Sequence, residues 1–327
     1  MTTATSGARL LITGGSGFIG SHVVRTLAGS SQASEVRLLV RRTPAGLPDA
    51  ASVTAREVPG GLADHVALRE LCDGVDTVLH LANRIDGTLE ECTVVNVDGT
   101  RALLRAAAAA GVRRVLYLST TAVYEDGLHR GAVEDGLPRR PKSPASVTRL
   151  RAEEMVRDAG GLVVRPHMVY GAGDRWVVPA MARMVRALPG WVDGGGARMT
   201  LIAVDDLARA VAALALARWD TLASGVLHAG HPEPVRARDV LTAAATAVRL
   251  PVPREDISYD RAGELLGAAR DPRSARMLSL FARDHWYDCS ALWRAVGSPP
   301  GAGFPDAFAR HAPWYRERRH DLVPTGS

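Results

Sequence analysis

The chain has 327 residues, 46% of them hydrophobic and 23% charged, which is the balance of an ordinary soluble globular protein. Its net charge of +5 rests on arginine, because Lys142 is the only lysine, and no aromatic residues interleave with the arginines as a nucleic-acid surface requires. The chain shows no apolar run of the roughly 18 residues of a spanning helix, no secretory signal pattern and no paired cysteine spacing. We therefore expect a cytoplasmic monomer or homodimer without a metal, which binds neither nucleic acid nor membrane.

Short apolar runs predict five buried strands, at residues 8–14, 35–41, 76–82, 114–120 and 161–166. Segments with helical spacing separate these strands, at 19–29, 65–74, 99–111 and 147–160. Continuous apolar strands that alternate with helices imply a parallel sheet covered on both faces. The sequence therefore predicts an α/β fold with a Rossmann-type doubly wound parallel sheet.

The pattern loosens after Pro166 into stretches rich in glycine, proline and tryptophan, interrupted by helical segments at 204–219 and 236–248. A smaller body over the carboxyl edge of the sheet would fit, since ligands of such sheets bind there. We expect two domains. Residues 1–165 with 204–231 would form the NADP-binding Rossmann domain, and 166–203 with 232–327 a smaller C-terminal substrate-binding domain.

The segment "LLITGGSGFIGSHVV" places Gly14, Gly17 and Gly20 at the end of the first strand, which leads straight into a helix, and we expect these glycines with Phe18 and Ile19 to contact a dinucleotide. Glycines let the backbone turn sharply and approach a diphosphate, whose charge meets the free N–H groups at the start of the helix. The alternative is a tight strand-to-helix turn with no ligand. The position at the first strand favours a dinucleotide site.

The end of the second predicted strand carries Arg41 and Arg42 in place of the carboxylate that NAD-binding proteins offer to the adenosine ribose. A guanidinium group matches a 2′-phosphate and suits an unphosphorylated ribose poorly. The alternative is that both arginines face water. We expect NADPH or NADP⁺ as the cofactor.

Five further segments follow in order along the chain: "VLHLAN" at 78–83, "VNVDGT" at 95–100, "YLSTTAVY" at 117–124, "VVRPHMVYG" at 163–171 and "LIAVDDLARA" at 201–210. Together with the glycine loop they resemble the extended short-chain dehydrogenase/reductases, which include sugar-nucleotide epimerases and dehydratases. The likeness runs from about residue 8 to 317. Gly61 is a departure, because the family usually has an aspartate there for the adenine amino group.

The resemblance implies roles for individual residues. Thr120 would occupy the family's catalytic Ser/Thr position, and Asn96 its structural asparagine. Further cofactor contacts would come from Leu81, Ala82, Asn83, Pro166, His167 and Met168. Candidate substrate contacts are Thr121, Tyr124, Trp176 and Trp191. For Tyr124 we favour packing over catalysis, and the alternative for the two tryptophans is that they belong to the core.

The family's Tyr-x-x-x-Lys pair is missing. Aligned on "RAEEMV", the tyrosine position falls on Ala145 and the lysine position on Arg149, which can still donate hydrogen bonds to the ribose of the cofactor. An unprotonated alkoxide at pH 7 would cost on the order of 12 kcal/mol, from about nine pK units. One hydrogen bond from Thr120, worth roughly 1.5 to 3 kcal/mol to a charged acceptor, cannot offset that cost.

Three proton sources remain, namely water, a displaced side chain such as His167, or the substrate itself. A phenol next to the ketone would supply the group that the lost tyrosine supplies, and aromatic polyketides abound in such hydroxy-ketones. We therefore expect an NADPH-dependent ketoreductase acting on an aromatic polyketide-like ketone, by analogy with tyrosine-less members of the family. Our sharpest expectation is an angucyclinone ketoreductase of antibiotic biosynthesis with substrate-assisted protonation. The alternatives are a sugar-nucleotide reductase or epimerase and a non-catalytic NADP(H) sensor.

Overall fold

A seven-stranded sheet forms the centre of the larger body, in the order β12-β7-β5-β4-β1-β2-β3, and every neighbouring pair is parallel. This is a computed structural model, and it describes residues 7–42, 48, 50–59, 61–217 and 225–322. The strands are β1 (Ala8–Thr13), β2 (Ala33–Val40), β3 (Val53–Glu57), β4 (Thr77–His80), β5 (Arg114–Leu118), β7 (Leu162–Pro166) and β12 (Val226–Ala229).

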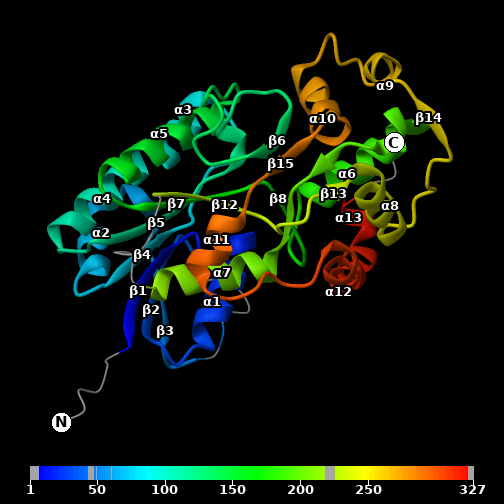
Figure 1. The fold of residues 1–327 in the computed structure, drawn as a ribbon. Coiled ribbons are helices and arrows are strands. Elements are labelled where there is room, and N and C mark those ends of the chain that lie inside the picture. The colour runs from blue at the N-terminus through cyan, green and yellow to red at the C-terminus, as the bar shows by residue number, and fades with distance from the viewer. Residues whose placement is uncertain (1–6, 43–47, 49, 60, 218–224, 323–327) are drawn as a thin grey trace.

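Helices cover both faces of this sheet (Figure 1). One face packs against α1 (Phe18–Ala28), α7 (Val204–Leu216) and α11 (Ser290–Val296). The other packs against α2 (His65–Cys72), α4 (Gly99–Ala109) and α5 (Pro144–Asp158). Short turns complete this body: α3 (Leu89–Cys92), the π-helical η2 (Thr93–Asp98), η1 (Gly61–Ala63) and η3 (Thr121–Val123). The doubly wound α/β fold expected from the sequence is confirmed.

The five strands predicted from apolar runs are all present, whereas β3 and β12 were not predicted as strands. β3 lies at the sheet edge, and its side chains are half-buried or exposed, so it lacks a continuous apolar run. β12 has only four residues and includes the buried His228. An edge strand and a short strand with a buried polar residue both escape a search for apolar runs.

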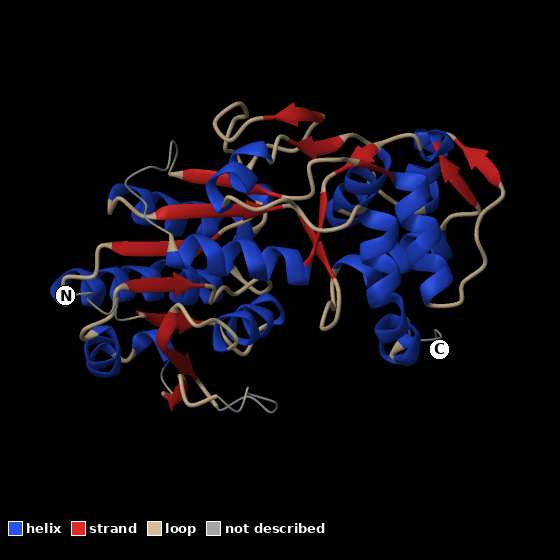
Figure 2. Cartoon of the chain, turned by 60° about the horizontal axis from the view of Figure 1, so that its bottom comes forward, coloured by secondary structure: helices blue, strands red, loops and turns tan. Residues whose placement is uncertain are grey.

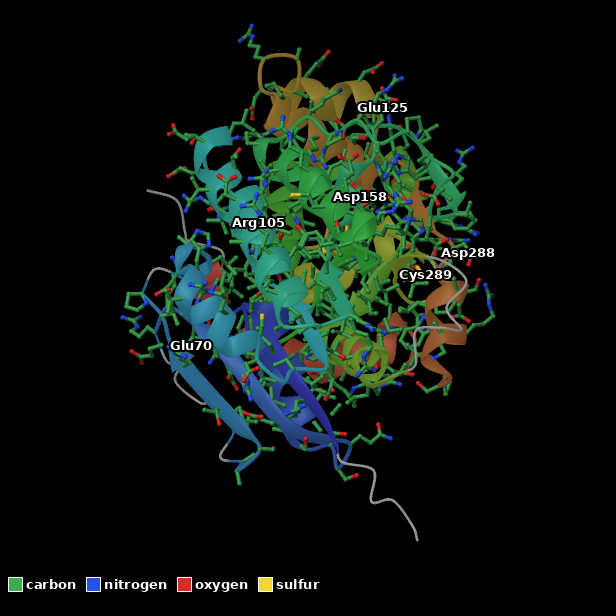
Figure 3. All side chains as sticks on the ribbon, turned by 90° about the vertical axis from the view of Figure 1, so that its left-hand side faces the viewer. Glu70, Arg105, Glu125, Asp158, Asp288 and Cys289 are labelled. Atoms are coloured by element: carbon green, nitrogen blue, oxygen red, sulfur yellow. The ribbon has the colours of Figure 1, made fainter. Side chains whose placement is uncertain are left out.

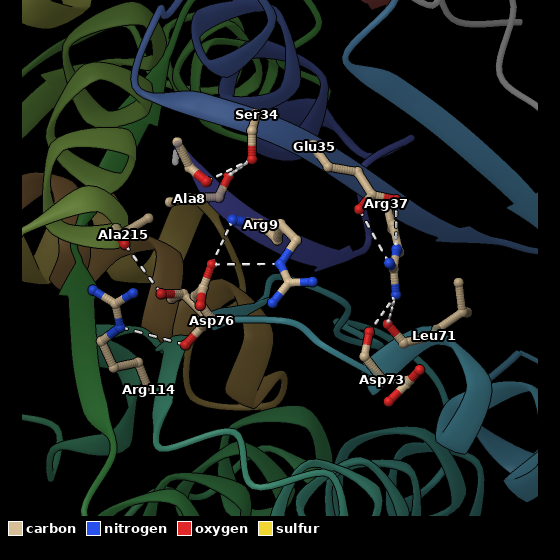
Figure 4. A network of polar contacts seen from close by, with 12 residues as sticks. Ala8, Arg9, Ser34, Glu35, Arg37, Leu71, Asp73, Asp76, Arg114 and Ala215 are labelled. Atoms are coloured by element: carbon tan, nitrogen blue, oxygen red, sulfur yellow. Dashed lines mark hydrogen bonds and ion pairs between the residues drawn. The ribbon is translucent and has the colours of Figure 1, made fainter. Parts of the chain in front are cut away.

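The amino edge of the sheet is held by a polar network, shown in Figure 4. The backbone N–H of Arg9 donates to the Asp76 carboxylate at 2.7 Å, and the side chain of Arg37 donates to Glu35 and to two backbone carbonyls at the end of α2, those of Leu71 and Asp73. Arg114 donates to the Asp76 carbonyl at 3.3 Å. These contacts tie the starts of β1, β2, β4 and β5 together, at the edge opposite the carboxyl ends of the strands.

The smaller body lies beyond the carboxyl edge and is mostly helical (Figures 1 and 2). Its helices are α6 (Val177–Ala187), α8 (Ala237–Ala247), α9 (Tyr259–Leu265), α10 (Pro272–Ala282), α12 (Phe304–Glu317) and α13 (Arg319–Leu322). Small sheets join it to the larger body, formed by β6 (His129–Ala132), β8 (Met168–Tyr170), β9 (Gly190–Val192), β10 (Arg198–Met199), β11 (Leu201–Ala203), β13 (Val235–Arg236), β14 (Glu255–Ile257) and β15 (His285–Tyr287), with the turn η4 (Asp193–Gly195). None of the described helices is both long and apolar enough to cross a membrane.

Two elements cross the domain division expected from the sequence. β6, within residues 1–165, pairs with β15 from the smaller body. The helix α11, which we had placed with residues 232–327, packs on α7 and β12 through Leu292 and Trp293 in the first core. The two bodies therefore share strands and core, and the site between them is built from both.

Candidate active site

The glycine loop after β1 is shaped by close backbone contacts. Gly14 has φ +75°, and a Cβ there would lie 2.5 Å from the backbone nitrogen of Ala82. A Cβ at Gly20 would collide with the carbonyl oxygen of Gly14. No side chain caps the start of α1, and its first turn carries no acidic residue. The bare helix start and the close-packed glycines fit a diphosphate group.

Arg41 and Arg42 follow directly after β2 and are both exposed. The stem of Arg41 lies over Gly61, where a Cβ would come 3.6 Å from Arg41 Cγ. Gly61 has φ +55°, a conformation that favours glycine. The residue that replaces the family's aspartate therefore belongs to a turn beside Arg41, and this leaves cationic groups at the place expected for the adenosine end of a cofactor.

The segment that follows β4 lies between the glycine loop and β5. Leu81 is buried, and its backbone N–H donates to the Thr13 carbonyl at 3.0 Å. The Asn83 side chain donates to the Leu118 carbonyl at 3.1 Å and accepts from the Tyr117 hydroxyl at 2.6 Å. The side chain of Asn83 is thus held by β5, and its amide group is occupied by these two hydrogen bonds.

The helix α5 carries the two positions where the family has its tyrosine and lysine. Ala145 offers only a methyl group, and the next turn of α5 holds Arg149. One Arg149 nitrogen donates to the carbonyls of Leu118 (3.0 Å) and Ser119 (2.6 Å), at the carboxyl end of β5. The Nε of Arg149 is enclosed and has no hydrogen-bond partner among the described residues. It is the atom that a ribose hydroxyl could satisfy.

Asn96 fixes α5 in place. Its side chain accepts from the Arg84 N–H at 2.7 Å and donates to the Arg84 carbonyl and to the Thr148 hydroxyl, both at 2.9 Å. Asn96 is fully buried in the π-helical turn η2. The position of α5, and with it that of Ala145, therefore follows from this amide.

A pocket of about 360 Å³ lies at the carboxyl end of β5 and β7, where α10 and β15 of the smaller body meet η3. It brings together six of the residues predicted from the sequence: Thr120, Thr121, Tyr124, His167, Met168 and Trp176. Trp176 is half-exposed at the rim, with 51% of its surface accessible. In Figure 3, Glu125 of the same wall lies close to α10. Apolar walls come from Val177, Ala180, Met277, Leu280 and Phe281.

Three residues that sequence reasoning missed form one polar wall of the pocket: His129, His285 and Tyr287. His285 pairs with His129 across β15 and β6, and its ring is stacked on that of His167 with centroids 6.0 Å apart. The Tyr287 hydroxyl lies 2.7 Å from His129 Nδ1. A signal did exist, because His285 and Tyr287 alternate along one strand and so share a face.

The imidazoles at this wall are neutral. Burial lowers the pKa of His285 to about 4, and burial lowers the pKa of His167 well below its ordinary value, helped by the nearby histidines. Burial also lowers the pKa of His129, against a hydrogen bond to the Glu125 carbonyl. These imidazoles can therefore bind polar groups but carry no positive charge at pH 7.

Tyr124 lies in the pocket wall, but its hydroxyl points into the protein. It lies 2.6 Å from the Glu134 carbonyl, 2.6 Å from His228 Nε2 and 2.6 Å from an Arg165 nitrogen. Arg165 also pairs with Glu153, and both of these side chains are fully buried. Burial raises the pKa of Tyr124 to about 12. Tyr124 contributes its ring to the pocket, and its hydroxyl proton is donated to these internal partners rather than to a ligand.

Trp191 does not reach this pocket. It is only 2% exposed in the second core, where it lines a separate, much smaller cavity with Leu188 and Phe281. Its strand β9 pairs with β14. Of the two tryptophans expected to flank the cleft, only Trp176 lines it. The packing alternative holds for Trp191.

The sheet order and the glycine loop together define the class of Rossmann-fold dinucleotide-binding proteins. The profile of the NAD dependent epimerase/dehydratase family matches residues 10–226. This protein belongs to that family.

Individual relatives span reductases and sugar-nucleotide proteins. The 4-hydroxy-2-methyl-3-oxo-4-farnesyl-3,4-dihydroquinoline-1-oxide ketoreductase of Stigmatella aurantiaca is 33% identical over 197 residues, 57% of this chain but only 58% of that protein's length. The ceramide reductase of Caulobacter vibrioides is 30% identical, with 93% of both chains covered. Among solved structures, MoeE5 in complex with UDP-glucose and NAD is 26% identical with a TM-score of 0.68, over 95% of this chain and 99% of that one.

Proposed function

We propose that this protein is an NADPH-dependent ketoreductase of secondary metabolism, whose substrate is an aromatic polyketide-like ketone that supplies its own proton. The observation that carries the proposal is the pocket beside Thr120. Its walls are mostly apolar with neutral histidines, its Arg276 is paired with Asp126, and α5 presents Ala145 where the family has its proton-donating tyrosine. Such a pocket suits a flat, mostly apolar ketone better than a charged sugar nucleotide.

The loop from Gly14 to Gly20 and the start of α1 would hold the diphosphate of the cofactor, and Arg149 Nε would meet its ribose. Arg41 and Arg42 would meet a 2′-phosphate. When bound, the reduced nicotinamide supplies a hydride to the carbonyl carbon.

Thr120 would bind the ketone oxygen. Its Oγ1 accepts from the Ala122 N–H at 3.2 Å, so its single proton is free to be donated into the pocket. One neutral donor polarises the carbonyl but does not protonate it. The substrate's oxygen therefore takes the proton of an adjacent phenol, and the phenolate recovers a proton from water.

The relatives give support at the level of reaction type. Two of the proteins named above are a ketoreductase and a reductase, and the first is named for a 4-hydroxy-3-oxo-dihydroquinoline, in which a hydroxyl group sits on the carbon next to the ketone. By the same reasoning we propose an angucyclinone-type hydroxy-ketone as the sharpest substrate candidate. The likeness to MoeE5 favours a sugar-nucleotide reductase or epimerase as the second candidate.

The test is to mix the protein, NADPH and a hydroxyaryl ketone and to follow the absorbance of the reduced cofactor. We expect turnover that collapses when the phenol next to the ketone is methylated, because the internal proton source is then gone. Turnover that is insensitive to methylation would contradict substrate assistance, because the proton donor would then be a side chain of the protein. Turnover of a UDP-sugar instead would favour the second candidate. Tight NADPH binding with no turnover of any ketone would favour a non-catalytic sensor.

A further inference from the structure

Two cavities lie along the contact between α6 and α10 in the smaller body. The pocket of about 360 Å³ next to Thr120 includes Ala180 of α6 and Leu280 of α10 in its wall. A second cavity, of about 20 Å³, is lined by Met184 of α6 and Leu278 of α10. Ala180 and Met184 lie on the same face of α6, about one turn or roughly 5–6 Å apart along the helix axis. The two cavities are therefore neighbours.

Phe281 separates these two cavities. Among the described residues that line either cavity, Phe281 is the one that lines both. Its neighbours on α10 are divided between them, because Leu280 lines the larger pocket and Ala282 the smaller cavity. Phe281 is only 6% exposed and belongs to the second core, so close packing holds its ring in place. The larger pocket therefore ends at a fixed aromatic side chain.

The smaller cavity has mostly apolar walls, which include Met184, Val185, Leu188 and Leu278. Such surroundings favour hydrocarbon over water. Each methylene group that moves into them from water should raise the affinity of a ligand about fourfold. A ligand in the larger pocket does not gain this energy, because Phe281 stands between the two spaces. Removal of the Phe281 ring would join them and make room for a longer hydrocarbon group.

We propose that Phe281 is a specificity-determining residue, which ends the pocket and limits the substrate to a compact ring system without an extended alkyl group on the side that faces α6 and α10. Thr120 comes from the larger body, at the carboxyl end of β5, and Phe281 from the smaller body. A ketone whose oxygen is bound by Thr120 places the far side of its ring system toward Phe281. The inference rests on the proposed function and deepens it by naming the residue that sets the size of the substrate.

Binding of n-alkylbenzenes, from toluene to n-hexylbenzene, tests the separation of the cavities without any ketone chemistry. Calorimetric titration of the protein with NADP⁺ present gives the affinities. In the parent protein we expect the affinity to stop rising at a chain length that fills the larger pocket. In Phe281→Ala it should rise about fourfold further with at least one more methylene group. Leu278→Val enlarges only the smaller cavity, so it should keep the parent's limit.

Phe281→Leu is the second variant, because it keeps more of the core than Phe281→Ala and should shift the limit in the same direction by a smaller amount. Thermal unfolding identifies the variants that remain folded. The same limit in the parent and in a folded Phe281 variant would overturn the proposal. An affinity that rises through the whole series in the parent, or no binding at all in the folded variants, would overturn it as well.

The role in specificity is tested with NADPH and 2-hydroxyacetophenones that carry an alkyl group of increasing length on the ring. We expect kcat/KM of the parent to fall beyond a short alkyl group, and Phe281→Ala to favour the next longer ketones about fourfold per methylene group. Leu278→Val should show the parent's preference. An unchanged preference in a variant whose alkylbenzene limit has moved would reject the specificity role and leave the ketoreductase standing. A moved limit with no turnover of any ketone would reject the proposed function and leave Phe281 as the boundary of the pocket.

Discussion

The two ends of the site are built in opposite ways. The nucleotide end is one continuous stretch, the loop and first helix at 14–28, which offers backbone N–H groups and lies near two exposed arginines. The end where we propose that the ketone binds, called the ketone end below, is assembled from segments around Thr120, His167, Trp176 and Arg276, which are far apart in the sequence and belong to both bodies. Backbone donors and positive charge dominate the first end, whereas the second has mainly apolar walls with neutral histidines, and its Arg276 is paired with Asp126. The first end is therefore suited to an anion, and the second to a mostly apolar ligand.

The largest effect is expected at one of the two tryptophans, Trp176 and Trp191, which were both predicted from the sequence to contact the substrate. Trp191→Ala removes a fully packed ring from the second core and should lower the free energy of unfolding by about 3–5 kcal/mol. Trp176→Ala removes a half-exposed rim residue and should change stability little while it weakens ketone binding. Chemical denaturation and ketone titration separate the two effects. A large loss of ketone affinity in Trp191→Ala at unchanged stability would contradict its assignment to the core.

Substitution of Gly20 should weaken cofactor binding at the nucleotide end. In Gly20→Ala the new methyl group collides with the Gly14 carbonyl, a backbone atom that cannot rotate away. Overpacking of this kind costs roughly 1–3 kcal/mol, so we expect NADPH to bind up to about 100-fold more weakly, with the ketone pocket intact. Gly127→Ala is the control, because a Cβ there meets nothing within 4 Å. Cofactor titration by fluorescence measures both, and equal affinity in the two variants would refute the close-packed loop.

This difference also explains what the sequence could predict. The glycine loop was recognised because its requirements are local: a strand, three glycines at fixed spacing and a helix start within one segment. The strands with continuous apolar runs were recognised for the same reason. β3 escaped because an edge strand is exposed, and α11 was assigned to the wrong body because its contacts with α7 and β12 are tertiary.

At the ketone end, Thr120 and His167 were found through the family resemblance, but their partners were not. His129, His285 and Tyr287 reach the pocket only because β15 pairs with β6, a pairing between strands that no local pattern joins. Trp191 shows the opposite error, because it was predicted to line the cleft and lies in the second core. The sequence alone does not distinguish an aromatic residue that lines a cleft from one that packs in a core. The pocket residues that the smaller body supplies are thus the part of the site that could be identified only from the three-dimensional structure.

The neutral histidines of the ketone end should make stability depend on pH. The pKa of His285 is about 4 in the folded protein, below its ordinary 6.5, so the unfolded chain binds more protons between these values. Stability from this residue is therefore complete above about pH 6.5 and falls as the pH drops toward 4, by about 2 kcal/mol at pH 5. Thermal unfolding at pH 7 and pH 5 should show a smaller loss in His285→Asn than in the parent. The exposed His65→Asn should retain the parent's full loss, and an unchanged loss in His285→Asn would mean that this histidine does not titrate as described.

The smallest effect is expected at the arginines, because both are exposed and solvent weakens each contact. Arg41→Ala combined with Arg42→Ala should weaken NADPH about tenfold while NADH changes less than about twofold, because only NADPH carries the 2′-phosphate that a guanidinium group can meet bidentately. Arg105→Ala on α4, labelled in Figure 3, is the matched control, as it removes an exposed arginine that is not predicted to contact the cofactor. Affinities measured at two salt concentrations add a second criterion, since the loss should shrink as salt screens the phosphate. Equal weakening of the two cofactors would contradict a contact with the 2′-phosphate and would mean that the arginines act on a part that both cofactors share. The difference in charge between the two ends would then remain, but it would carry no preference for NADPH over NADH.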